Sequence, residues 1–191
     1  AQNFTTATDA YNVAVGFNAG TAVTTGIQNT LIGGLAGDAL TDADKNIAIG
    51  YNALTADTLG SRSVAIGVSA LGAQNFTTAT STYNVGVGHN AGAAVTVGTI
   101  NTLIGGIAGA ALTTGDSNVA VGYVALQSDT LGDRAVAIGA GALKTQNFTT
   151  ATSNYNVGIG YDAGAAVTTG TENTLIGGLS GDALTTGIRN V

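Results

Sequence analysis

The sequence predicts an all-β fold, a parallel β-solenoid (β-roll) of 17-residue coils in which every fourth coil is a longer, 21-residue coil. Three observations predict it: a Gly-rich composition without proline, a 72-residue repeat, and a shorter repeat inside it. The chain is then a single repeat array over residues 1–191. Its superrepeats span approximately 12–83, 84–155 and 156–191 (partial), and residues 1–11 end a preceding one.

The composition excludes several classes of protein. The chain has 30 glycines, no Cys, Met or Trp, and only 8% charged residues, but it is 45% hydrophobic. A disordered low-complexity segment would lack those aliphatic side chains. The net charge of −6 argues against a nucleic-acid partner, which requires a basic surface. Because no apolar run approaches the roughly 18 residues of a membrane span, we expect no membrane insertion of this segment.

Both periods can be read directly. The stretch Gln-Asn-Phe-Thr-Thr-Ala-Thr begins at Gln2, Gln74 and Gln146, which gives the 72-residue repeat. Within each unit an anchor residue, usually Asn, is followed four positions later by Gly, and the anchors advance by three 17-residue steps and then one 21-residue step. Aligned columns of this kind indicate coils stacked on one another. The anchors are Asn12, Asn29, Asn46, Ser63, Asn84, Asn101, Asn118, Ala135, Asn156, Asn173 and the last, incomplete one at Asn190.

Each anchor opens a short predicted strand. Ile47 and Ile49 flank Ala48, and this period of two over β-branched residues predicts a strand with one face buried. We expect the small middle residue to face the other way, where something else packs closely. Leu31 and its equivalents, Leu103 and Leu175, break this pattern once per superrepeat. Two glycines per coil are expected to supply corners with positive φ.

Two further columns have structural interpretations. The Asn anchors form either a ladder of stacked amides between coils or a set of turn-capping side chains, or both. Four of the five basic residues immediately precede an anchor and should line one edge, near acids such as Asp44 and Asp133. They are Lys45, Arg62, Arg134 and Arg189.

The coil Asn46-Ile47-Ala48-Ile49-Gly50-Tyr51-Asn52-Ala53-Leu54 resembles the Asn-Thr-Ala-Ile-Gly-Tyr-Asn-Ala-Leu repeats of phage tail-fibre-like proteins. Ser63-Val64-Ala65-Ile66-Gly67 is similar to the repeated motif in the heads of trimeric autotransporter adhesins. The resemblance implies a homotrimer, intertwined or side by side, and makes the small column at Ala48 a candidate face for chain-to-chain packing. Adhesin heads generally have shorter coils, so the 17-residue period favours the fibre.

The expected function is therefore a structural fibre shaft, a section of a phage or phage-like tail fibre that supports host attachment. The alternative is the head or passenger region of a bacterial trimeric surface adhesin. Either implies a location on a virion or outside the cell. A fibre-borne enzyme would need a pair of carboxylates, and no acid pair recurs, so we expect no catalysis and no cofactor. Asp38, Asp42 and Asp44 are close in sequence, but equivalent coils lack these acids, so we expect solvated turns and no metal site.

The insertion in the 21-residue coil is the candidate functional site. Extra residues in a solenoid coil form a loop on one face, often the binding face. Its aromatic and Asn side chains either receive a cell-surface carbohydrate, with avidity from repetition, or pack over the groove between chains and clamp the trimer. We favour the second. The candidate residues are Asn3, Phe4, Tyr11, Asn75, Phe76, Tyr83, Asn147, Phe148 and Tyr155.

Overall fold

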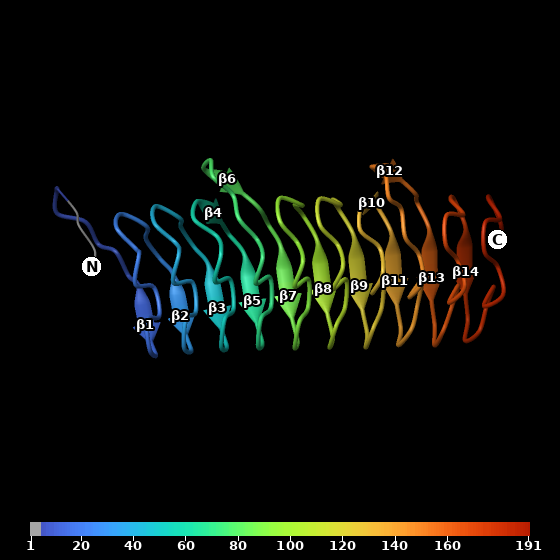
Figure 1. Ribbon diagram of the computed structural model, residues 1–191, viewed down its shortest axis with the longest axis horizontal. Helices are drawn as coiled ribbons and strands as arrows, with labels where there is room; N and C mark the ends of the chain where they lie inside the picture. The colour runs from blue at the N-terminus through green and yellow to red at the C-terminus, as the bar shows by residue number, and fades with distance from the viewer. Residues whose placement is uncertain (1–4) are drawn as a thin grey trace.

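The computed structural model describes residues 5–191 as one row of stacked coils, with all main strands parallel (Figure 1). One ten-stranded sheet runs the length of the row in the order β1-β2-β3-β5-β7-β8-β9-β11-β13-β14, and β4-β6 and β10-β12 form two small sheets. The described residues contain no helix. The strands are β1 (Val13–Val15), β2 (Thr30–Ile32), β3 (Ile47–Ile49), β4 (Gly60–Ser61), β5 (Val64–Ile66), β6 (Thr80–Ser81), β7 (Val85–Val87), β8 (Thr102–Ile104), β9 (Val119–Val121), β10 (Gly132–Asp133), β11 (Val136–Ile138), β12 (Thr152–Ser153), β13 (Val157–Ile159) and β14 (Thr174–Ile176).

The strand register confirms the predicted coils. Ala48 pairs with Ala65 across a 17-residue coil, and Ala65 pairs with Gly86 across a 21-residue coil. Each coil also donates backbone hydrogen bonds to the next, as from Ile47 N to Ser63 O at 2.9 Å. The predicted parallel β-solenoid is therefore confirmed. Neighbouring strands lie about 4.8 Å apart, so the ten strands span about 43 Å.

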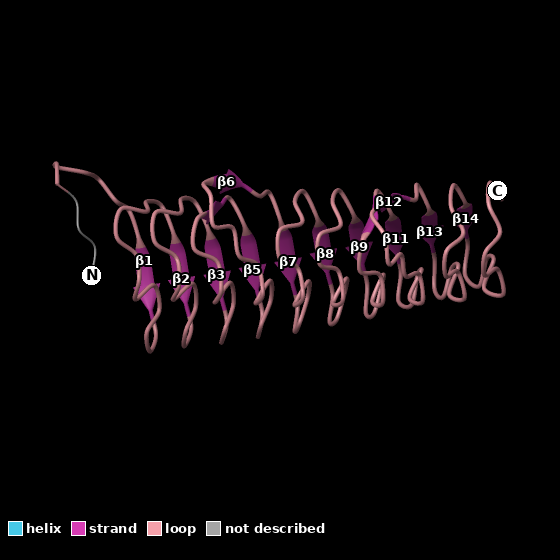
Figure 2. Ribbon diagram, turned by 45° about the horizontal axis from the view of Figure 1, so that its top comes forward, coloured by secondary structure: helices cyan, strands magenta, loops and turns pink. Residues whose placement is uncertain are grey.

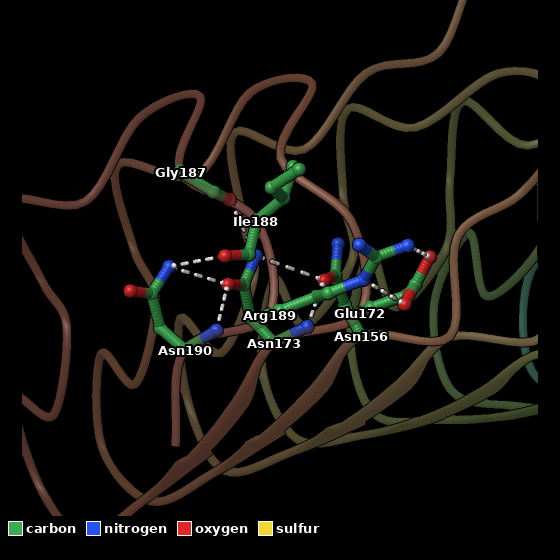
Figure 3. Close-up of polar contacts among 7 residues, drawn as sticks. All are labelled: Asn156, Glu172, Asn173, Gly187, Ile188, Arg189 and Asn190. Atoms are coloured by element: carbon green, nitrogen blue, oxygen red, sulfur yellow. Dashed lines mark hydrogen bonds and ion pairs between the residues drawn. The ribbon is translucent and has the colours of Figure 1, made fainter.

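The Asn anchors form a ladder that is buried from Asn29 to Asn173 and is drawn for the C-terminal coils in Figure 3. Asn173 Oδ1 accepts hydrogen bonds from the backbone N (3.0 Å) and Nδ2 (2.8 Å) of Asn190. Asn173 Nδ2 donates in turn to Gly187 O at 2.8 Å. Both interpretations of the column hold, because each amide joins two coils and also satisfies a carbonyl in the turn before the following anchor. Burial makes each such bond costly to lose.

The predicted orientation of the strand side chains was wrong. Ala48, Ala65 and Ala120 are fully buried, whereas Ile47 is 36% exposed and Val15 58% exposed. The small residues therefore face the interior of the chain's own solenoid, and the β-branched residues face outward. The interior at this point is too thin for a large side chain, because leucines from the opposite arc of the coil already fill it. The small column is thus not available for chain-to-chain packing.

Interior packing repeats with the 72-residue period. Leu31 occupies the space left by two glycines of the opposite arc: a Cβ at Gly20 would lie 2.6 Å from Leu31 Cδ1, and one at Gly37 2.8 Å from Leu31 Cδ2. In the next coil the pattern reverses, with Ala48 on the strand and Leu54 in the opposite arc. The large side chain thus lies on the strand in one coil and in the opposite arc in the two coils that follow. The leucines that replace the small residue on a strand therefore fill space left by glycines of the opposite arc. This core packing repeats every 72 residues, as the insertion does.

The glycines at the end of each strand turn the chain as predicted, with φ between 124° and 139° in every complete coil. The second glycine of the coil has another role. Gly26 lacks a left-handed φ, but a Cβ on it would lie 2.4 Å from Ala43 O, so it permits close stacking. Other left-handed corners belong to residues with side chains. Every residue that precedes an anchor has φ between 49° and 66°, from Tyr11 to Arg189.

Candidate functional site

The insertion projects from the edge of the row at which the main strands begin (Figure 1). Its returning segment, β6, pairs with β4 of the coil before it, with Gly60 opposite Thr80. The second insertion repeats this pairing through β10 and β12, with Gly132 opposite Thr152. The exposed turn of the first insertion covers residues 77–79. The predicted loop on one face is therefore present, as one protrusion per complete superrepeat.

A buried carboxylate holds the insertion against the solenoid. Asp57 is fully buried, and its Oδ1 accepts hydrogen bonds from the backbone N of Gly60 and of Phe76, both at 3.0 Å. Gln74 Nε2 donates to Asp57 Oδ2 at 2.5 Å, and Gln74 Oε1 accepts from Asn84 Nδ2 at 2.9 Å. The polar chain thus joins the coil before the insertion to the anchor after it.

The second insertion contains the same arrangement. Asp129 Oδ1 accepts from the backbone N of Gly132 (3.1 Å) and Phe148 (3.0 Å), and Gln146 Nε2 donates to Asp129 Oδ2 at 2.6 Å. Gln146 Oε1 accepts from Asn156 Nδ2 at 2.8 Å. Burial raises the pKa of both aspartates, because the hydrogen bonds only partly offset the loss of solvation.

Sequence reasoning missed these aspartates and glutamines, although a signal was present. Eleven positions after each anchor lies an interior column that reads Val23, Leu40, Asp57, Gln74 and then repeats. Six of its ten members are Val or Leu, and the polar members occur only in the coil before an insertion and in the coil that contains it. A polar pair in an otherwise aliphatic interior column indicates a buried hydrogen-bonded contact between adjacent coils.

The insertion also replaces the Asn ladder where it is interrupted. Ser63 and Ala135 lack the anchor amide that would accept from the next anchor. In the second insertion, Asn154 Oδ1 accepts from Asn156 N at 2.9 Å and restores the missing contact. In the first, Thr82 Oγ1 accepts from Asn84 N at 3.4 Å and also bonds Ser63 Oγ at 2.6 Å. The two anchors that depart from Asn thus lie where an insertion supplies a substitute acceptor.

The stability of the chain should fall as the pH rises from about 4 toward neutrality. The folded state holds the protons of Asp57 and Asp129 more tightly than the unfolded chain does, because burial raises their pKa. Their contribution is complete below the unfolded pKa of about 3.9 and is lost as the pH rises through the folded value. Urea unfolding midpoints measured across this range test the slope.

The control for this prediction is a pair of variants. Asp57→Asn with Asp129→Asn should flatten the pH dependence, whereas substitution of the exposed Asp42 and Asp116 by Asn should not. Arg189 lowers the pKa of Glu172, which gives an opposite slope, but that pair is present in all three proteins. An unchanged slope in the first variant would contradict the assignment.

The structure separates the aromatic residues that the sequence grouped together. Phe76 and Phe148 are buried, 6% and 5% exposed, so little of either ring is accessible to a ligand or another chain. Tyr83 and Tyr155 are each 55% exposed. Among the aromatic residues, the two roles considered for the insertion therefore concern mainly the tyrosines. Tyr11 is also exposed, and its hydroxyl donates to Asp9 Oδ2 at 3.3 Å.

The asparagines of the insertion act within the chain. Asn75 Oδ1 accepts from Thr58 Oγ1 at 3.3 Å, and Asn147 Oδ1 accepts from Thr130 Oγ1 at 3.0 Å. Asn75 is exposed and Asn147 half-buried. Asn3 and Phe4, the equivalent candidates near the start of the chain, lie outside the described residues.

The exposed tyrosines pair with the arginines that precede the neighbouring anchor. The guanidinium carbon of Arg62 lies 5.8 Å from the centre of the Tyr83 ring, and Arg134 stands over Tyr155 at the same distance. Each arginine also donates to a serine hydroxyl of the insertion, Arg62 to Ser81 and Arg134 to Ser153. The predicted basic edge is thus present, and the insertion brings an aromatic ring to it.

The three clustered aspartates serve different contacts. Asp38 accepts from Thr55 Oγ1 at 2.6 Å, Asp42 from Thr25, and Asp44 from the backbone N of Ile27 at 2.8 Å. Residues 5–191 contain no group of three His, Cys, Asp or Glu side chains that could hold a metal ion. Over the same residues no helix is long and apolar enough to cross a membrane.

The fold and these contacts define a solenoid repeat protein with one buttressed protrusion per complete superrepeat. Comparisons with protein-family models, with curated proteins and with solved structures found no match to the chain.

Proposed function

We propose that this chain is a section of a homotrimeric fibre shaft that supports host attachment, of the phage or phage-like tail-fibre kind, and that it is not an enzyme. The observation that carries the proposal is the outward face of the ten-stranded sheet. Each strand presents two outward side chains, which gives twenty positions, and all but Thr30, Thr102 and Thr174 are Val or Ile. No charged residue interrupts this apolar strip.

The strip has the properties of an association surface. It is continuous over about 43 Å, and every added coil lengthens it by about 4.8 Å. Contiguous apolar patches on soluble proteins mark interaction sites, whereas a solvated sheet face would carry mostly polar side chains. The occupant that fits a flat strip with this repeat is another copy of the same chain, because its own strip has an equal length and an equal coil spacing. The resemblance to tail-fibre repeats is the basis for proposing that three copies associate.

The alternative function is the head of a bacterial trimeric adhesin, which the Ser63-Val64-Ala65-Ile66-Gly67 motif favours. In this alternative the three chains would associate through the same apolar strip. The 17-residue coil favours the fibre shaft. An enzymatic role has no supporting feature in the described residues, where both buried carboxylates are engaged by backbone and glutamine donors.

The association is tested by mass in solution. The chain should sediment as a trimer, and a variant with Ile66→Lys and Ile138→Lys should sediment as a monomer, because two ammonium groups would then face the partner strips. Both isoleucines point outward from the sheet, so the circular dichroism spectrum should not change. Val97→Lys is the control, because Val97 is 49% exposed but lies outside the sheet. A monomeric wild-type chain would contradict the trimer.

A further inference from the structure

The exposed edge of the solenoid carries two equivalent clusters, which we call the Arg–Tyr stations: Arg62 with Tyr83, and Arg134 with Tyr155. In each, a guanidinium stands over a tyrosine ring at 5.8 Å, and the tyrosine is more than half exposed. Both arginines are exposed as well. The stations are separated by one 72-residue superrepeat, which is four coils or about 19 Å along the rod.

The positive charge of each station is not neutralised by an ion pair. Within residues 5–191 the two ion pairs join Lys144 to Asp162 and Arg189 to Glu172. The acids beside the stations accept hydrogen bonds from the backbone of the preceding coil instead. Asp44 Oδ1 accepts from Ile27 N at 2.8 Å, and Asp133 Oδ1 accepts from Asp116 N at 2.8 Å. Each guanidinium donates one N–H to a serine hydroxyl, so its other N–H groups can donate to a ligand.

The backbone around each station is tied to the solenoid. Arg62 and Tyr83 both have a left-handed backbone, at φ 66° and 52°, and precede buried anchors. Ser81 belongs to β6, which is paired with β4 and fixed from beneath by the Asp57–Gln74 contact. Figure 1 shows β6 and β12 standing out from the row of main strands, and Figure 2 shows the same for β6 from another side. A preorganised site loses little conformational entropy when it binds a ligand.

We propose that the Arg–Tyr stations bind carboxylate-bearing sugar units of an acidic polysaccharide. The apolar face of a sugar ring would pack on the exposed part of the tyrosine, and the sugar carboxylate would accept hydrogen bonds from the guanidinium. Two stations about 19 Å apart on one rigid rod add avidity to weak single contacts. The inference deepens the proposed function and rests on it in one respect, since a shaft that supports attachment meets such polymers outside the cell.

Binding of oligogalacturonate to the intact chain tests the proposal, with dextran and dextran sulfate as neutral and sulfated comparisons. Isothermal titration should show binding of oligogalacturonate and none of dextran. Tyr83→Ala with Tyr155→Ala, and separately Arg62→Gln with Arg134→Gln, should each weaken it by about tenfold or more. Lys45→Gln with Arg189→Gln is the matched control, because it removes two charges from the same column away from the tyrosines. It should weaken binding less than about threefold.

The stations would be overturned by no binding of oligogalacturonate, by equal loss in the control variant, or by equal binding of dextran. Binding of dextran sulfate that survives the tyrosine substitutions would show a diffuse charge effect and would also overturn them. The sedimentation mass of each protein is measured in parallel. A monomer that still binds oligogalacturonate would contradict the trimer and leave the stations in place, so the two proposals can fail separately.

Discussion

Replacing Gly105 by Ala should lower the free energy of unfolding by about 3 kcal/mol or more. Gly105 has φ 133°, a conformation that L side chains rarely adopt, and a Cβ there would lie 2.4 Å from Gly122 O of the next coil. Backbone strain and overlap with a main-chain atom act together, and the main chain of the next coil cannot move without breaking its own hydrogen bonds.

The residue that follows it provides a matched control. Gly106 lacks a left-handed φ, and a Cβ on it would lie 3.4 Å from the ring of Tyr123, an ordinary contact. Gly106→Ala should therefore change the stability by less than about 1 kcal/mol. Urea and thermal unfolding followed by circular dichroism compare the two variants. Equal losses would show that the corner geometry is not what makes the first substitution costly, because the lower unfolded-chain entropy of alanine stabilises both variants.

Leu103→Ala should cost about 2 to 5 kcal/mol, because this fully buried side chain fills space that two glycines leave open. A Cβ at Gly92 would lie 2.6 Å from Leu103 Cδ1, and one at Gly109 2.7 Å from Leu103 Cδ2. Without the leucine, neither glycine has a side chain that could fill the cavity. Urea unfolding again provides the measurement.

The reciprocal arrangement of the next coil suggests a rescue. There Ala120 lies on the strand and Leu126 in the opposite arc, with φ 51°. Leu103→Ala combined with Gly109→Leu imposes this pattern on the previous coil, and it should recover at least about 1 kcal/mol of the loss. Gly109→Leu alone should be destabilising, since Leu103 already occupies the space. A double variant no more stable than Leu103→Ala would argue against size complementarity as the origin of the 72-residue core pattern.

Much of the fold could be predicted from aligned columns. The spacing of the anchors gives the strand register, because in a parallel solenoid each residue pairs with its equivalent one coil later. The Gly column at the strand ends gives one corner, and the Asn column gives the ladder. The assignment of the second Gly to a corner failed because composition does not distinguish a positive φ from a close approach of two backbones, as at Gly26.

The sequence did not separate the buried residues of the insertion from the exposed ones. Phe76 and Tyr83 belong to one recurring motif, but the phenylalanine is buried and the tyrosine exposed. The polar contact beneath them was missed because Asp57 and Gln74 lie one coil apart and look like surface residues when each is considered singly. Their shared interior column becomes visible only when it is known which columns face inward.

The repeat pattern alone was enough to set the stacking: the coil length, the register and the place of each protrusion. Equivalent coils must pair in step to satisfy their backbone hydrogen bonds. Which strand face lies inside depended on packing in three dimensions. Ile47, Ala48 and Ile49 are all apolar, so hydrophobicity permits either orientation. Leucines of the opposite arc leave room for a methyl group but not for a β-branched side chain, and this packing turns the Val and Ile strip outward.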